Sequence, residues 1–280
     1  MSTIPIRQIK DSFFEERFSI RNLEPLTYEK DLVHELHRHD FYFVLFVKTG
    51  SGQHEIDFVK HPVGDYNCFF IRPGQVHELL LSQGTSGFMV QFTTDFYAPK
   101  EIQVLEVLRK VSHQNFWSLA SAEFEQIESI SALIFQEYAQ KSNRYKEALK
   151  SYLDILFIVL ARFSQTEQPE HKLYAQERLD ALFDLMEKNI GSKKQVSDYA
   201  EMLSMTSYQL NSITKSLVQK TTSELITEQI ILEAKRLLIA TTNQVNQVAY
   251  LLGYDDTSYF IRFFKKKTGH TPEAFRQHFK

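Results

Sequence analysis

The sequence predicts an α+β protein, in which an antiparallel β-barrel is followed by helices and then by a separate all-α domain. Three observations lead to this prediction. Six of the nine glycines lie between residues 50 and 87, among short runs rich in β-branched and aromatic residues. From about residue 100 onward, glycine and proline are scarce and apolar residues recur every three or four positions. Two stretches near the carboxyl end resemble each other at an offset of 49 residues.

Composition limits the class of protein. A chain of 280 residues is long enough for about two domains, and its apolar fraction of 43% and charged fraction of 24% are typical of a globular protein. Cys68 is the single cysteine, which excludes an intrachain disulfide and a cysteine-based zinc finger. No apolar run is long enough to span a bilayer, and the first 18 residues lack the apolar segment of a signal peptide. We therefore expect a cytoplasmic protein.

The charge of the chain is divided unevenly. Residues 170–280 carry 15 Lys and Arg against 13 Asp and Glu, a net charge of +2. The remaining residues carry 17 against 22, a net charge of −5. A contrast of this size permits nucleic-acid binding by the carboxyl-terminal part without requiring it.

The first domain is expected to be built from short strands. Candidate strands are Phe41–Val47, Glu55–Val59, Cys68–Ile71 and Phe88–Phe92, and turn sequences such as TGSG and RPGQ lie between them. This spacing predicts an antiparallel barrel or sandwich at about residues 25–95.

Helices are expected to follow the barrel over about residues 100–164. Apolar residues recur at threes and fours from Phe124 to Tyr138 and again from Leu149 to Phe163. A polar segment that contains Pro169 predicts a linker at residues 164–172. The linker would separate a domain at residues 1–165 from a domain at residues 173–280.

The repeat in the second domain predicts two helix-turn-helix units. Residues 196–203 match residues 245–252, and each copy indicates a short helix, a tight turn and a second helix. Gly253 supplies the positive φ that ends a helix, and Ser204 takes this place in the first copy. A helix over about residues 223–240, roughly 27 Å long, would join the copies. A helical bundle that does not bind DNA has the same periodicity and remains an alternative.

The residues of the second copy favour DNA binding. Its sequence from Val248 to Arg276 resembles the signature of the AraC/XylS family of bacterial regulators: a helix, a Gly-aromatic turn, a second helix and a Gly-x-Thr-Pro ending. The resemblance extends from about Leu179 to Phe279 and implies a sequence-specific transcription regulator. The first copy departs from the pattern at Thr214 and Gln219, where the family usually has an aromatic residue and a glycine.

By position in the family pattern, the recognition helices should span about Ser207–Val218 and about Thr257–Lys267. Arg262 can bind guanine through two hydrogen bonds, Asn211 can bind adenine, and Ile261 can contact a thymine methyl group. Lysines are suited to phosphate. The residues that the resemblance implies at the DNA are Tyr208, Asn211, Ser212, Lys215, Thr257, Ser258, Ile261, Arg262, Lys265 and Lys266.

The first domain is similar to the cupin-like sensor domain that many AraC/XylS regulators carry. The similarity rests on His37-x-His39, expected on one face of a strand, and on the Pro-Gly-x-x-His sequence that ends at His77. It implies a small-molecule effector bound near His37, His39, Tyr42 and His77. Metal-dependent cupins usually have a glutamate shortly after the first two histidines, and aromatic residues lie there in this chain. We therefore expect no cofactor and no metal, although three imidazoles are able to bind Zn²⁺ or Fe²⁺.

Three hypotheses about function remain open at this stage. The first is a ligand-responsive transcription regulator that forms a homodimer through residues 123–163 and works with RNA polymerase. The second is a metal-dependent cupin enzyme with a helical appendage, although no nucleophile arrangement or phosphate loop indicates a reaction. The third is a DNA-binding dimer whose barrel binds no ligand.

Overall fold

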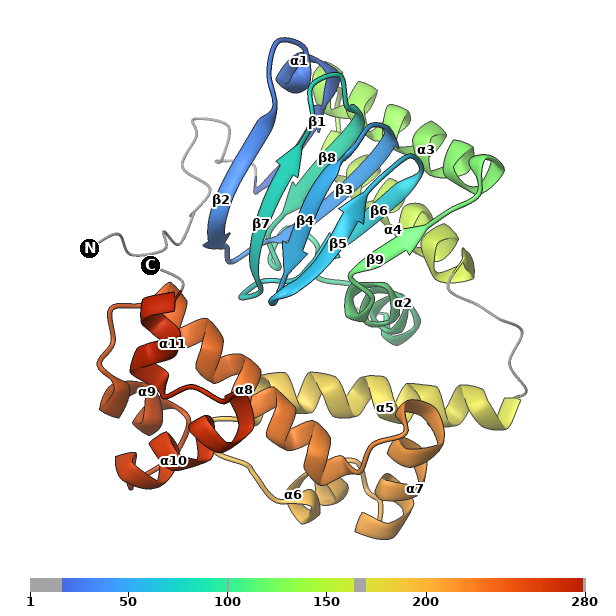
Figure 1. Ribbon diagram of the computed structural model, residues 1–280. Coiled ribbons are helices and arrows are strands. Elements are labelled where there is room, and N and C mark those ends of the chain that lie inside the picture. Colours follow the sequence, from blue (N-terminus) through green and yellow to red (C-terminus); the bar gives the residue numbers. More distant parts are fainter. Residues whose placement is uncertain (1–16, 100, 164–169, 279–280) are drawn as a thin grey trace. The chain divides into compact units, whose positions relative to one another are not determined.

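The computed structural model describes residues 17–99, 101–163 and 170–278, which form two compact units on either side of residues 164–169 (Figure 1). The predicted α+β class is confirmed, with an antiparallel β domain followed by a helical domain. The amino-terminal segment and residues 164–169 of the predicted linker lie outside the described residues. The last three residues of that linker belong instead to helix α5, which begins at Glu170.

The amino-terminal unit contains two antiparallel sheets. The five-stranded sheet has the order β1-β8-β3-β6-β9, and the four-stranded sheet has the order β2-β7-β4-β5. Its short first helix, α1, spans Glu24–Thr27. The strands are β1 (Phe18–Asn22), β2 (Leu32–Arg38), β3 (Tyr42–Thr49), β4 (Gly52–Ile56), β5 (Val59–Val63), β6 (Asn67–Ile71), β7 (Val76–Leu81), β8 (Ser86–Phe92) and β9 (Phe116–Ser118).

Alternation along the strands divides the apolar residues between two cores. On β3, Phe43 and Leu45 face the space between the sheets, and Val44 and Phe46 face the opposite side. That opposite side is covered by helices (Figure 1), which are α2 (Ile102–His113), α3 (Ser121–Gln140) and α4 (Tyr145–Phe163). The helices expected at residues 124–163 are therefore confirmed, and they bury one face on their own sheet.

One predicted strand was wrong. Glu55–Val59 spans the end of β4, a turn and the first residue of β5. Asp57 and Phe58 form the turn with φ of 46° and 69°, the left-handed pair that suits a tight hairpin. The apolar and β-branched residues around the turn resemble a strand, and an Asp-Phe turn carries no glycine to mark it. Two more strands, β1 and β9, lie outside the predicted range 25–95.

Residues 170–278 of the carboxyl-terminal unit form seven helices. They are α5 (Glu170–Asn189), α6 (Val196–Met202), α7 (Ser207–Val218), α8 (Thr222–Ala240), α9 (Val245–Leu251), α10 (Thr257–Thr268) and α11 (Pro272–His278). Helix α8 contacts α6 and α7 on one side of the repeat and α9, α10 and α11 on the other (Figure 1). It has 19 residues, a length of about 28 Å. The predicted joining helix and both predicted recognition helices are thus confirmed.

None of the helices in the described ranges is both long enough and apolar enough to cross a bilayer.

Candidate nucleic-acid interface

The two turns of the repeat have the same backbone geometry. The carbonyl oxygen of Ala200 accepts a hydrogen bond from the Met205 amide at 2.8 Å, and that of Ala249 accepts one from the Tyr254 amide at 2.9 Å. Both alanines are buried, so the second helix of each unit crosses the first closely. The positive φ expected of Gly253 is observed at 69°. Each unit is therefore a helix-turn-helix.

Each recognition helix is capped at its start and buried along one side. The Thr206 hydroxyl accepts from the Gln209 amide at 3.2 Å at the start of α7. At the start of α10, the Asp256 carboxylate accepts from the amides of Ser258 and Tyr259 at 2.7 and 3.1 Å. These caps satisfy amides that the helix itself leaves without partners. Leu210 of α7 and Phe260 of α10 are fully buried, and this burial fixes which face of each helix is exposed to solvent.

The solvent face of α7 is polar. Tyr208 is 83% exposed, and Ser212 and Lys215 are exposed beside it. These side chains line a groove of about 790 Å³ together with Asn211, Ser216, Thr221 and Ser223. All four residues that the resemblance implies at DNA on this helix thus lie along one groove.

Asn211 differs from its neighbours in this groove. It is half-buried, and its Oδ1 accepts a hydrogen bond from the backbone amide of Thr222 at 2.9 Å. The side chain therefore caps the start of α8. Pairing with adenine requires the donor and the acceptor of the amide together, so the predicted adenine contact conflicts with the bond to Thr222.

The solvent face of α10 is basic. Ser258, Arg262, Lys265 and Lys266 are exposed along it, while Thr257 and Ile261 are half-buried. A guanidinium nitrogen of Arg262 lies 4.0 Å from the Asp256 carboxylate, and both side chains are largely exposed. An exposed ion pair at this distance contributes little to stability. The guanidinium can therefore exchange this carboxylate for another acceptor at small cost.

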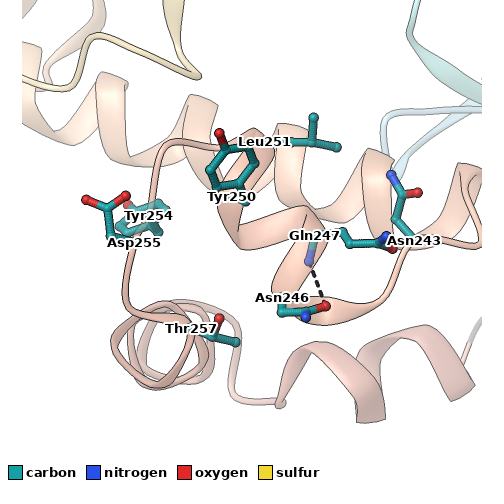
Figure 2. Close-up of a pocket in the computed structure, with 8 residues that line it drawn as sticks. All are labelled: Asn243, Asn246, Gln247, Tyr250, Leu251, Tyr254, Asp255 and Thr257. Carbon is teal, nitrogen blue, oxygen red and sulfur yellow. Dashed lines mark hydrogen bonds between the residues drawn. The ribbon is translucent and has the colours of Figure 1, made fainter.

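A second hollow lies beside the start of α10 (Figure 2). Its volume is about 580 Å³, and its walls come from the end of the α8–α9 connection, from α9 and from the turn. Among its residues the sequence had indicated only Thr257. The lining consists of Asn243, Asn246, Gln247, Tyr250, Leu251, Tyr254, Asp255 and Thr257.

One contact between the first and second helix-turn-helix units was not predicted. Lys194, in the segment before α6, donates a hydrogen bond from Nζ to the Gly253 carbonyl oxygen at 2.6 Å and lies 4.7 Å from the centre of the Tyr254 ring. Burial lowers the pKa of the Lys194 amine. A side chain at residue 253 would place its Cβ 2.1 Å from the Gly191 carbonyl oxygen. The segment before the first unit is therefore packed directly against the turn of the second.

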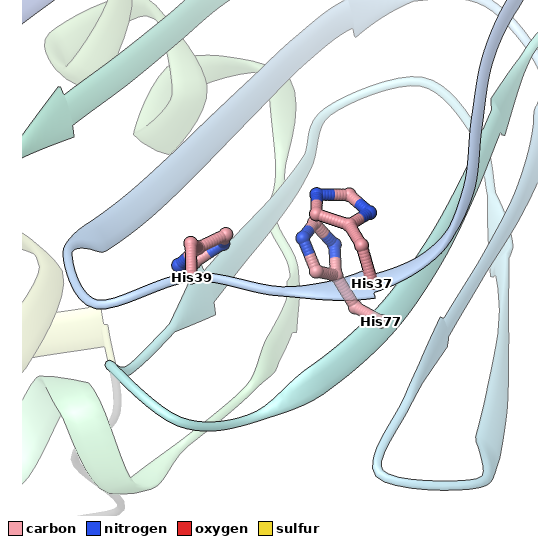
Figure 3. Close-up of side chains that lie close together, drawn as sticks. All are labelled: His37, His39 and His77. Atoms are coloured by element: carbon pink, nitrogen blue, oxygen red, sulfur yellow. The ribbon is translucent and has the colours of Figure 1, made fainter. Parts of the chain in front are cut away.

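In the amino-terminal unit, the three predicted histidines lie together (Figure 3). One ring nitrogen from each of His37, His39 and His77 lies within 4.8 Å of the others, and all three are buried. His37 pairs with His77 across β2 and β7. His39 follows the last residue of β2, so the predicted shared strand includes only His37.

His54 on β4 also belongs to this group, although nothing in the sequence marked it. Its Nε2 lies 3.0 Å from Nδ1 of His77, and both rings are fully buried. Burial lowers the pKa of both imidazoles well below the usual value for histidine. Pairing across β4 and β7 would have been needed to place His54 here, and that pairing is not evident from local sequence.

Tyr42 does not join the histidines, so its prediction as a pocket residue was wrong. Its ring packs on the helix-facing side of the five-stranded sheet, 4.9 Å from Phe92 and 5.8 Å from Phe70. The neighbouring Phe43 faces the histidines instead, with its ring centre 5.3 Å from that of His77. Successive residues of a strand point to opposite faces, and this alternation excludes Tyr42 from the space between the sheets.

Two family models match successive parts of the chain, and the first of them extends beyond the amino-terminal unit into α6. The family model described as an AraC-like ligand binding domain matches residues 27–201, and a helix-turn-helix domain model matches residues 199–278. The activator RhaR of Mannheimia succiniciproducens is 23% identical over 248 residues, which cover 87% of each chain. RhaR of Yersinia pestis is 22% identical over 257 residues, covering 87% of this chain and 84% of its own.

Among solved structures, ToxT of Vibrio cholerae covers 94% of this chain and 98% of its own, with 14% identity and a TM-score of 0.43. The family models alone match well over half of the present chain's length. The chain belongs to the AraC/XylS family of transcription regulators, with a ligand-binding domain ahead of a helix-turn-helix DNA-binding domain.

Proposed function

We propose that this regulator binds DNA through α7 and α10 and that α10 supplies most of its sequence specificity. The observation that carries the proposal is the charge and exposure of α10. Arg262, Lys265 and Lys266 are exposed on one helix that is buried on its other side by Phe260 and Phe264. On α7, Lys215 is the basic residue at the position that matches Lys265. Helix α8 contacts both recognition helices and would hold them about one turn of DNA apart.

The side chains divide by chemistry. Arg262 would bind a guanine through O6 and N7, with Ser258, Thr257 and Ile261 facing the neighbouring base pairs. The phosphates would be contacted by Lys215, Lys265 and Lys266. Tyr208 and Ser212, which line the protein groove along α7, would contact phosphates as well. Asn211 would act by holding the start of α8 through Thr222.

The ligand-binding domain, which we place at residues 1–165, would bind a small effector and thereby change the DNA affinity of residues 173–280. The relatives that match most of the chain are activators by name. On this basis we propose that the protein acts in the cytoplasm, assists RNA polymerase and is not an enzyme. A melting temperature that rises with one metabolite, together with a changed DNA affinity, would support an effector. The absence of both across a metabolite library would favour a dimer that senses nothing.

Dimerisation would use the solvent side of α3 and α4. Four large apolar residues are at least 37% exposed there: Leu133, Phe135, Ile155 and Ile158. A second copy of the chain would cover them. Sedimentation of Ile155→Asp should then show a monomer, and Val33→Asp, which replaces an apolar residue on β2 that is also exposed, should remain a dimer. A dimer in both variants would contradict this interface.

DNA binding is tested by selecting bound fragments from a random pool that includes the upstream region of the gene, using the full chain. We expect a motif made of half-sites. Lys265→Ala and Lys266→Ala should weaken binding to all sequences alike and reduce the slope of log K against log salt by about 1 each. Recovery of no motif, or a slope unchanged in both variants, would contradict the assignment of α10.

A further inference from the structure

Four buried histidines lie in a core that is otherwise built from aliphatic and aromatic residues. His37, His39, His54 and His77 are each at most 3% exposed, and they adjoin the apolar cluster between the two sheets. Burying an imidazole in such surroundings is costly unless its nitrogen atoms are bonded. The arrangement of these nitrogens therefore indicates what the cluster binds.

Two of the rings have a defined tautomer. Nδ1 of His37 lies 2.7 Å from the Glu35 carbonyl oxygen, and Nδ1 of His39 lies 2.8 Å from the Phe41 carbonyl oxygen. A carbonyl oxygen can only accept a hydrogen bond, so Nδ1 carries the hydrogen in both rings and Nε2 has a lone pair. Histidines that bind metals are oriented in this way, with the second nitrogen donating to a carbonyl or carboxylate.

The third ring is oriented by the fourth histidine. Nδ1 of His77 lies 3.0 Å from Nε2 of His54, and Nε2 of His77 is buried with no hydrogen-bond partner among the described residues. When His77 donates from Nδ1 to His54, its Nε2 also has a lone pair. His54 then has the same role for His77 that the backbone carbonyls have for His37 and His39.

The spacing fits a single ion. One ring nitrogen from each histidine lies within 4.8 Å of the others, and nitrogens bound to one tetrahedral zinc ion are about 3.3 Å apart. An ion bound by all three would draw these nitrogens together through rotation of the rings. The ring centres of His37 and His77 are already 4.3 Å apart, and those of His39 and His77 are 4.9 Å apart.

We propose that His37, His39 and His77 bind one divalent transition-metal ion through their Nε2 atoms, with His54 positioning His77. A set of three imidazoles selects ions such as Zn²⁺, Ni²⁺ or Fe²⁺ over Mg²⁺ and Ca²⁺, which prefer oxygen ligands. Three protein ligands leave a coordination position for a water molecule or a polar group of a small molecule. This inference replaces the expectation from the sequence that the histidines bind no metal, and it is independent of how α10 contacts DNA.

The test is a titration of the full-length protein after removal of bound metal with a chelator. Co²⁺ followed by visible absorption, and Zn²⁺ followed by calorimetry, should each bind at one equivalent per chain. His39→Gln and His77→Gln should weaken binding by more than about 100-fold, and His54→Gln by about 10–100-fold, the range for a residue that orients a ligand. His61→Gln should bind like the wild type, because His61 faces His54 across β4 and β5 and lies outside the cluster of three.

The proposal would be overturned by no binding at one equivalent by the wild type, or by unchanged affinity in both His39→Gln and His77→Gln. An equal loss in His61→Gln would do the same, since it would indicate a general effect on the sheet. If a histidine variant fails to fold, the wild type alone still tests the site. X-ray absorption of the zinc-loaded wild type should show three imidazole ligands, and a shell made only of oxygen would contradict the site.

Discussion

Thr214 lies on the buried face of recognition helix α7 and Phe264 on the buried face of α10, and the two helix-turn-helix units attach these helices to their neighbours in different ways. Both side chains are fully buried. The Thr214 hydroxyl is 3.2 Å from the Asn211 carbonyl oxygen and 3.3 Å from the Thr222 hydroxyl. Phe264 packs its ring between those of Phe260 and Phe275 at 6.0 and 5.7 Å. Hydrogen bonds thus connect α7 to α8 in the first unit, and aromatic packing fills the second.

The ends of the helices differ in the same sense. Ser204, in the turn, has a φ of 55°, and Gln219, at the end of α7, has a φ of 58°. The second unit has glycine at both matching positions, Gly253 and Gly269. Hydrogen bonds across the helix ends are nonetheless alike, with Gln219 donating to the Lys215 carbonyl oxygen at 3.2 Å. The first unit therefore adopts a backbone that costs a non-glycine residue about 1–2 kcal/mol per left-handed position.

The largest effect expected from this comparison concerns the two buried residues. Phe264→Ala should lower the local free energy of unfolding of α10 and α11 by about 3–5 kcal/mol, because it removes a large ring from a closed core. Thr214→Ala should cost roughly 1 kcal/mol around α7, the usual contribution of one hydrogen bond. Hydrogen exchange of the full chain, analysed by mass spectrometry, resolves the two units. Equal losses would contradict the difference in packing.

A smaller effect is expected at the two turns. Gly253→Ala introduces a Cβ 2.1 Å from the Gly191 carbonyl oxygen and places alanine at positive φ. We expect a loss of about 2 kcal/mol or more and a weaker Lys194 contact. Ser204→Ala, at the matching position, should change stability by less than about 0.5 kcal/mol. Thermal unfolding followed by circular dichroism compares them, and a Gly253→Ala protein as stable as the wild type would refute the close approach.

The smallest effect is expected at the ends of the recognition helices. Gln219→Gly should raise stability by roughly 1 kcal/mol, because glycine adopts the left-handed conformation without a Cβ clash. Gly269→Ala should lower it by a similar amount. Denaturation in urea gives both values against the wild type. A change of the same sign in the two variants would mean that these positions do not share one backbone conformation.

The predictions from sequence succeeded where one chain segment determines the outcome. The bounds of helix α7 follow from the family resemblance, and the left-handed Gly253 follows from the turn residues, each within a few consecutive positions. They failed where distant segments meet. Tyr42 was assigned to the wrong face, because the choice depends on which side of the sheet the helices cover. Lys194 and His54 were missed, because their partners are 59 and 23 residues away.

The two residues predicted to read bases differ in what the structure shows of them. Arg262 was predicted from its place in the recognition helix, the structure leaves its side chain exposed, and its contact with DNA stays a prediction. Asn211 also has the right place and the right chemistry, but its oxygen already accepts the Thr222 amide at 2.9 Å. That acceptor role arises only once α8 is packed beside α7, so the sequence of the helix alone does not indicate it.

Arg262 and Ser212 occupy matching positions in the two helix-turn-helix units. Replacing each with alanine tests most directly whether α10 supplies most of the sequence specificity. Selection from a random DNA pool with Arg262→Ala should lose the preference at one base pair, equivalent to roughly 1–3 kcal/mol of discrimination. Ser212→Ala should leave the selected motif unchanged. An unchanged motif in Arg262→Ala, or a larger loss in Ser212→Ala, would contradict the assignment of specificity to the second unit.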